Sequence, residues 1–202
     1  MMSLLPFYLF VSFLLMLPGM PQPPAKSFKP AVMVSAMAYV KEKKETEEFI
    51  PWTYDRLLTW NDFKSPPRTG TDAVASTSTT LGLSYILRNG QVEYEITCNF
   101  SKKRSWGLIK TDYILAHEQA HFDITELFAR KLHQQLQAYK PNRKTFQKDI
   151  NTIYENVVKA KEAFQKLYDG ETDHSRKKVR QEEWLVRIDD MLAETEGLAY
   201  YP

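Results

Sequence analysis

Two runs of residues with a period of two predict a β-hairpin in the middle of the chain. The first run spans 81–87, the second spans 92–98, and Asn89-Gly90 lies between them. An Asn-Gly pair favours a type I′ turn, because both central positions of that turn need a positive φ. In the second run apolar and polar positions alternate, so we expect one face of the hairpin to be buried and the other to contact water.

The second half of the chain has the apolar spacing of helices. We expect helices over about 112–138, 144–167 and 177–196, with the first ending before Pro141. The first is apolar on more than one face, which predicts the most buried position. The short link at 139–142 favours an antiparallel pair. Together these elements indicate an α+β fold, with a small antiparallel sheet packed on the first helix and two further long helices.

The N-terminal part differs from the rest. Residues 4–20 are almost wholly apolar, and prolines and small residues follow up to Ala25. This order is typical of a secretory signal peptide over 1–25, and an uncleaved N-terminal anchor is the alternative. Residues 26–50 are expected to be a tether, because their dense mixed charge cannot supply a core. The folded domain is then expected over 51–202, outside the cytoplasm as a secreted or periplasmic protein.

Composition adds few restrictions. The 202 residues include 27 Lys and Arg against 25 Asp and Glu, a net charge of +2, which does not indicate a nucleic-acid binder. Hydrophobic residues make up 43% of the chain, enough for one core and one domain. The single cysteine, Cys98, excludes an intramolecular disulfide and is expected to be a small buried apolar residue.

A five-residue motif in the first predicted helix carries the chemistry. His117-Glu118-Gln119-Ala120-His121 has the pattern H-E-x-x-H. Residues four apart lie on the same face of a helix, so both imidazoles can bind one zinc ion. Glu118 is placed to act on a metal-bound water as general base. A random chain of this length would contain the pattern roughly 0.5% of the time, so an accidental match is the weaker interpretation.

A catalytic zinc needs a third protein ligand, and two histidines remain. His133 lies roughly 18 Å farther along the same helix, at 1.5 Å per residue, and cannot reach the metal. His174 follows the second helix after it has turned back toward the motif, in a stretch expected to be non-helical because of Gly170. The spacing favours His174 as the third ligand. The alternatives for this ligand are Glu171, Asp173 and Glu126.

Other side chains are candidates for supporting roles. Asp123 or Asp169 could orient a ligand imidazole, as a metal-bound histidine usually requires. Tyr168, Tyr200 or Tyr201 could donate a hydrogen bond to a developing oxyanion. The sequence does not choose among them.

Several segments together resemble a bacterial family, domain-of-unknown-function family 922, described as predicted secreted zinc-dependent proteases. The segments are Leu58–Lys64, Ala73–Ser76, Ser105-Trp106, Leu115–Glu126 and Tyr168–His174, followed by Gln181 and Trp184. The resemblance covers about residues 55–190. It implies a zincin-like fold, His117, His121 and His174 as zinc ligands, and Glu118 as the catalytic carboxylate. Ala120 and Ser175 stand where glycine is expected, and neither change removes a ligand.

These observations predict a secreted zinc metallopeptidase with one Zn²⁺ per chain and a peptide or protein substrate. The hairpin at 81–98 is expected to offer a strand edge to an extended substrate. No stable membrane association is expected after signal cleavage. One alternative is a hydrolase of cell-wall peptides or amides with the same site. Another is a non-catalytic extracytoplasmic metal-binding module, in which a fourth protein ligand would close the coordination.

Overall fold

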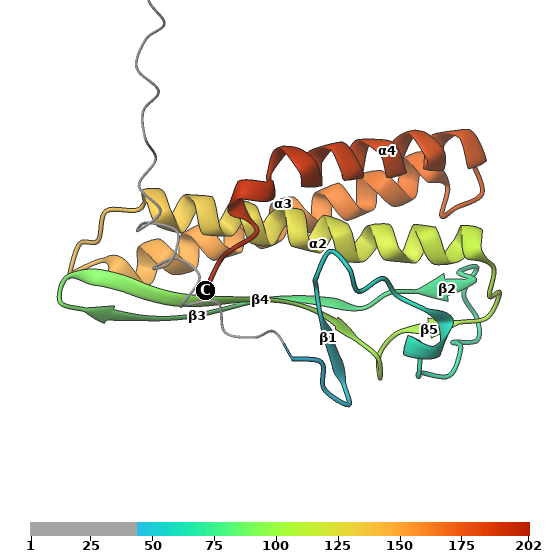
Figure 1. Ribbon diagram of the computed structural model, residues 1–202, viewed down its shortest axis with the longest axis horizontal. Coiled ribbons are helices and arrows are strands. Elements are labelled where there is room, and N and C mark those ends of the chain that lie inside the picture. Colours follow the sequence, from blue (N-terminus) through green and yellow to red (C-terminus); the bar gives the residue numbers. More distant parts are fainter. Residues whose placement is uncertain (1–43) are drawn as a thin grey trace, which may run out of the picture.

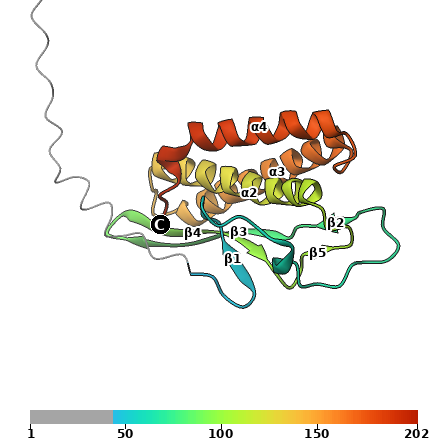
Figure 2. The ribbon, with the colours of Figure 1, turned by 45° about the vertical axis from the view of Figure 1, so that its right-hand side comes forward.

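The computed structural model describes residues 44–202, in which three long helices lie over one face of a small antiparallel sheet (Figure 1). The helices are α2 (Asp112–Ala138), α3 (Phe146–Thr172) and α4 (Lys178–Glu194). Helix α2 contacts the sheet and both other helices, and α4 lies on the far side of α2 and α3 from the sheet (Figure 2). The expected α+β class, with α2 as the central helix, is confirmed.

The strands form two small sheets. The larger has the order β1-β4-β3, with β1 at Phe49–Pro51, β3 at Thr79–Arg88 and β4 at Gln91–Ser101. The smaller pairs β2 (Ala75–Ser76) with β5 (Trp106–Gly107). Two short 3₁₀ helices, η1 (Trp60–Asp62) and η2 (Glu196–Leu198), complete the elements.

The hairpin between β3 and β4 is confirmed, together with its turn. Asn89 and Gly90 have φ values of 50° and 80°, as a type I′ turn requires. The register pairs Leu81 with Cys98 and continues to the turn. Cys98 is buried, as expected of a small apolar residue in this position. The face that carries Cys98 packs toward α2, which fixes that helix on the sheet.

Helix α2 has the bounds that the sequence predicts. The Thr111 side chain caps its N-terminus by accepting a hydrogen bond from the Ile114 backbone N–H. Apolar residues on several faces of α2 are buried, since the sheet covers one side and α3 and α4 cover others. The motif histidines therefore lie near the N-terminal end of a helix that the sheet, α3 and α4 hold in place.

Helix α3 is longer than the sequence predicts. The expectation of a non-helical stretch from Tyr168 to His174 is wrong, because α3 continues to Thr172 and includes Gly170. A glycine weakens a helix by only about 1 kcal/mol relative to alanine. The fully buried Tyr168 packs edge-on against Trp184 of α4, at 5.5 Å between ring centroids, and this contact holds the last turns in helical form.

Structure is described from Lys44 onward, so several expectations lie outside it. The expected signal peptide at 1–25 and the tether up to residue 43 are not among the described residues. Strand β1 begins at Phe49, two residues before the expected start of the domain. Among residues 44–202, no helix combines the length and the apolar composition needed to cross a membrane.

Candidate metal centre

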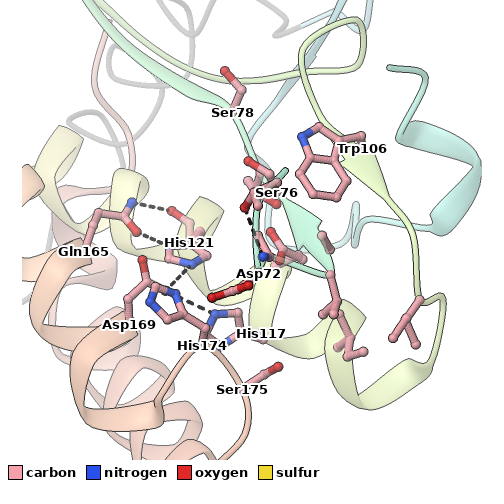
Figure 3. Close-up of a pocket in the computed structure, with 18 of the residues that line it drawn as sticks. Asp72, Ser76, Ser78, Trp106, His117, His121, Gln165, Asp169, His174 and Ser175 are labelled. Atoms are coloured by element: carbon pink, nitrogen blue, oxygen red, sulfur yellow. Dashed lines mark hydrogen bonds and ion pairs between the residues drawn. The ribbon is translucent and has the colours of Figure 1, made fainter. Parts of the chain in front are cut away.

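The two motif histidines converge with an aspartate from α3 (Figure 3). The Nε2 atoms of His117 and His121 lie 3.2 Å and 3.1 Å from Asp169 Oδ1. One potential ligand atom from each of these three residues lies within 4.8 Å of the others. The expectation that α2 brings both imidazoles to one point therefore agrees with the structure, and the third group at that point is Asp169.

The position of Asp169 follows from the extra turns of α3. Gln165 and Asp169 are four residues apart on a continuous helix, so both side chains lie on the face toward α2. From the sequence, Asp169 is expected only as a group that orients an imidazole. The sequence does contain a pattern that predicts the longer helix, because Phe164 and Tyr168 continue the apolar spacing of α3 past residue 167. Because Gly170 lowers the stability of the helix only slightly, that spacing predicts that Asp169 is helical.

Electrostatics within the cluster favour a bound cation. Burial opposes ionisation of Asp169, but hydrogen bonds to His117 and His121 outweigh it and lower the pKa of this carboxyl well below its usual range. Burial also opposes protonation of His121, yet the Asp169 hydrogen bond and the charge of Glu118 raise the pKa of His121. The centre thus holds a carboxylate that attracts positive charge, either as a proton or as a metal ion.

Gln165 fixes the orientation of the His121 ring. Its Nε2 donates a hydrogen bond to the His121 backbone carbonyl at 2.9 Å, and its Oε1 contacts His121 Nδ1. Because Oε1 can only accept, Nδ1 carries a proton, and Nε2 faces the cluster, where it donates to Asp169 when protonated and can bind a metal ion when neutral. Sequence reasoning missed Gln165, since a glutamine on a helix surface has no distinguishing pattern.

His174 lies beside the cluster at the rim of the cavity. Its Nδ1 is 3.5 Å from Asp169 Oδ1, and its side chain is 61% exposed. Asp173, His174 and Ser175 all have positive φ, between 50° and 72°, which is a strained conformation for residues other than glycine. This bend brings His174 back toward α2, so the structure does bring it to the site, although outside the set of three converging atoms.

The other candidate ligands have partners elsewhere. Glu171 accepts a hydrogen bond from Trp184 Nε1 at 2.8 Å, and Asp173 pairs with Arg176 at 3.4 Å. Glu126 is fully buried and binds Arg130 and Tyr201. None of these three carboxylates belongs to the cluster of converging ligand atoms within residues 44–202.

The remaining candidates for supporting roles also have other contacts. Asp123 accepts hydrogen bonds from Trp52 and Gln119, and burial raises its pKa to about 6. Tyr168 stacks on the His117 ring at 4.6 Å between centroids, so it packs the imidazole rather than facing the cavity. Tyr201 binds Glu126, and Tyr200 is exposed. His133, expected to lie too far along α2 to reach the metal, is buried and contacts the Tyr94 hydroxyl instead.

Glu118 is buried beside a large cavity. Only 4% of the residue is exposed, and its Oε2 has no hydrogen-bond partner among residues 44–202. The cavity has a volume of about 830 Å³ and extends between α3 and the segment 71–79. A buried carboxylate oxygen without a partner costs free energy, and at a cavity wall it is placed to accept a hydrogen bond from a bound group.

The donor set suits zinc. Two imidazole nitrogens and one carboxylate oxygen are ligands that Zn²⁺ binds readily, and three protein ligands beside a cavity leave a coordination position open. The partnerless oxygen of Glu118 fits the same interpretation, because it would face a group bound at the open position.

A family model described as "Bacterial protein of unknown function (DUF922)" matches residues 42–175, about two thirds of the chain. The chain belongs to this family. The match includes all of α2 and the stretch Tyr168–His174 that suggested the resemblance. Gln181 and Trp184 lie beyond it. Neither a curated protein nor a solved structure matches the chain.

Proposed function

We propose that this protein is a secreted zinc metallopeptidase with a zincin-like arrangement, in which His117, His121 and Asp169 hold the metal. The observation that carries the proposal is the convergence of these three groups beside Glu118, whose free carboxylate oxygen is buried at the cavity wall. Zinc held there would supply a Lewis acid for the substrate carbonyl and lower the pKa of a water molecule.

The roles of the protein side chains follow from their contacts. Glu118 Oε2 is free to accept a proton from the attacking water and to transfer it to the leaving amine. Gln165 holds the His121 ring in the tautomer that directs Nε2 toward the cluster. Tyr168 packs against the His117 ring and restricts its rotation. A purely structural metal site has no use for the carboxylate of Glu118 in this position.

A peptide substrate is supported by the cavity wall formed by β2. The hairpin at 81–98, expected to offer a strand edge, does not line the cavity; residues 71–79 do. Val74 and Ser76 face β5, because Val74 O accepts from Leu108 N and Ser76 pairs with Trp106. In an extended strand the backbone groups of Ala75 and Thr77 then point to the opposite side, away from β5. They could pair with an extended peptide.

Zinc content of variants tests the ligand set. We expect one zinc ion per chain in the wild type and in His174→Ala, and loss of zinc in Asp169→Ala. The reason is that Asp169 lies 3.1–3.2 Å from both Nε2 atoms, whereas His174 lies at the exposed rim. The opposite result, zinc lost in His174→Ala and kept in Asp169→Ala, would restore the third ligand that the sequence favoured.

Hydrolysis of a labelled unfolded protein, such as fluorescein-casein, tests the activity. Glu118→Gln should keep zinc and lose activity by roughly 10²- to 10⁴-fold, the usual contribution of a general base. Glu155→Gln, an exposed residue on α3 outside the cavity, is the matched control and should hydrolyse at the wild-type rate. Equal rates for Glu118→Gln and wild type would remove Glu118 from the mechanism.

A further inference from the structure

We infer that the cavity binds an acidic segment of the peptide substrate, through cationic side chains on α3 and at the cavity rim. This inference rests on the proposed function and specifies the class of substrate. It comes from the distribution of charge along the cavity and from the spacing of residues on α3, both independent of the motif.

Cationic side chains outnumber acidic ones on the cavity wall once the metal centre is set aside. Apart from Glu118 and Asp169, the charged lining residues are the cations Arg68, Lys161, Lys166 and Arg176 and the acids Asp72 and Glu162. The whole chain is close to neutral, at +2. The excess of positive charge in this part of the cavity is therefore a local feature, and a bound divalent metal would balance the charges of Glu118 and Asp169.

Three of these four cations are available to a ligand. Arg68, Lys161 and Lys166 have no ion-pair partner within the described part of the chain. Arg176 is held across the mouth of the cavity, because it pairs with Asp173 and donates to the Asp72 backbone carbonyl. An unpaired ammonium group in a concave site attracts anions more strongly than one on a convex surface, because the low-dielectric walls focus its field.

Helical spacing gives the distance of Lys161 from the metal centre. Lys161, Gln165 and Asp169 are successive residues at i, i+4 and i+8 of α3, so they form one row along the face toward α2. Eight residues of helix span about 12 Å. An extended peptide advances about 3.3 Å per residue, so Lys161 would meet a side chain three or four positions from the cleaved bond. Lys166 lies between, on the neighbouring row.

The opposite wall is compatible with a bound peptide but brings little negative charge. It contains the hydroxyl residues Ser76, Thr77 and Ser78 beside β2, and Asp72 is its single acidic residue among the lining groups. A carboxylate on the substrate can therefore approach Lys161 and Lys166 without meeting a line of like charges. Glutamate or aspartate side chains fit this arrangement, and lysine or arginine side chains would be repelled.

Peptide binding to the non-hydrolysing variant tests the inference. The protein is zinc-loaded Glu118→Gln, and the probes are fluorescein-labelled ten-residue peptides of Ala, Gly and Ser. Two of the peptides carry a pair of Glu residues, one near the N-terminus and the other near the C-terminus. Matched peptides carry a pair of Gln or Lys residues at the same positions. By fluorescence anisotropy at low salt, we expect the better placed Glu peptide to bind roughly tenfold tighter than its Gln counterpart, and the Lys peptide to bind weakest. The preference should shrink as salt is added.

Charge-reversal variants separate the cavity from the net charge of the protein. Lys161→Glu with Lys166→Glu should abolish the preference for the Glu peptide. Lys148→Glu with Lys159→Glu changes the net charge equally, uses exposed residues of the same helix outside the cavity, and should leave the preference intact. All four lysines are wholly or partly exposed, so both variants are expected to fold, which circular dichroism would check.

Three results would overturn the inference: equal binding of Glu and Gln peptides, equal effects of the two lysine pairs, or no binding of any peptide. Failure of the proposed function is a separate outcome. A wild-type protein that shows the charge preference yet hydrolyses nothing would contradict the peptidase and leave the acidic-segment site standing.

Discussion

Helix α2 carries two buried glutamates, Glu118 and Glu126, in opposite surroundings. They are eight residues apart, or about 12 Å along the helix. Glu126 accepts from Arg130 Nε at 2.9 Å and from the Tyr201 hydroxyl at 2.6 Å. Glu118 has an oxygen without a partner at the wall of a cavity. The same residue type thus forms an ion pair in the half of α2 around Glu126, the closed half, and has an unpaired oxygen in the half around Glu118, the open half.

The closed half is a cross-link between distant parts of the chain. Arg130 also donates to the Leu192 carbonyl and to Thr195 at the end of α4, and its guanidinium lies 5.2 Å from the centroid of the Trp52 ring. Burial raises the pKa of Tyr201, so its hydroxyl stays protonated and donates to Glu126. A buried charge is tolerated when its hydrogen bonds are complete, and this region meets that condition.

The open half does not meet that condition, and the proposed function gives the unpaired oxygen of Glu118 a use. Buried polar groups without partners concentrate at sites that bind ligands or perform chemistry. If the two halves differ in this way, substitutions in the closed half should reduce stability, and substitutions in the open half should reduce metal binding or activity.

The largest effect on stability is expected for Arg130→Ala. It would leave Glu126 buried without its cationic partner, which typically costs about 3–5 kcal/mol. Urea unfolding followed by circular dichroism would measure the loss. Lys131→Ala, at the next position of α2 and exposed, should change the free energy of unfolding by no more than about 0.5 kcal/mol. A loss below about 1 kcal/mol in Arg130→Ala would mean that the closed half is not a structural cross-link.

A middle-sized effect, on metal affinity rather than folding, is expected for Gln165→Leu. The change removes the acceptor for His121 Nδ1–H and should weaken zinc binding roughly 10- to 100-fold, as is usual for groups that orient a ligand histidine. Competition with a chelating dye would measure the affinity. Gln165→Glu keeps a hydrogen-bond acceptor for His121 and should retain most of the affinity for zinc. Equal affinity of wild type and Gln165→Leu would show that α2 alone orients the His121 ring.

The parts of the fold that sequence could predict are those with local causes. The hairpin follows from Asn89-Gly90, and the start of α2 follows from the cap at Thr111 and the apolar spacing after it. Likewise, the pairing of His117 with His121 needs only the geometry of one helix turn.

The parts that sequence missed depend on contacts between distant segments. The end of α3 is set by Tyr168 packing on Trp184, which outweighs the local cost of Gly170, and Asp169 reaches the centre only for that reason. Gln165 reaches His121 through the relative position of two helices, which no local pattern reports. The contact of Tyr201 with Glu126 joins residues 75 positions apart.

The smallest effect is expected for the stability of metal-free Glu118→Gln, and it tests the comparison most directly. Replacing a carboxylate whose Oε2 is buried without a hydrogen-bond partner by a neutral amide removes an unfavourable burial, so the free energy of unfolding should stay the same or rise by up to about 1 kcal/mol. Glu126→Gln is the matched change on the same helix. It should lower the free energy of unfolding by about 2 kcal/mol, because two hydrogen bonds to a charged group are weakened. Urea unfolding of both variants in chelator-treated buffer gives the two values side by side. A similar decrease in the free energy of unfolding in both variants would mean that Glu118 stabilises the fold as Glu126 does. Only a carboxylate that the fold does not need can lose its charge without a decrease in stability.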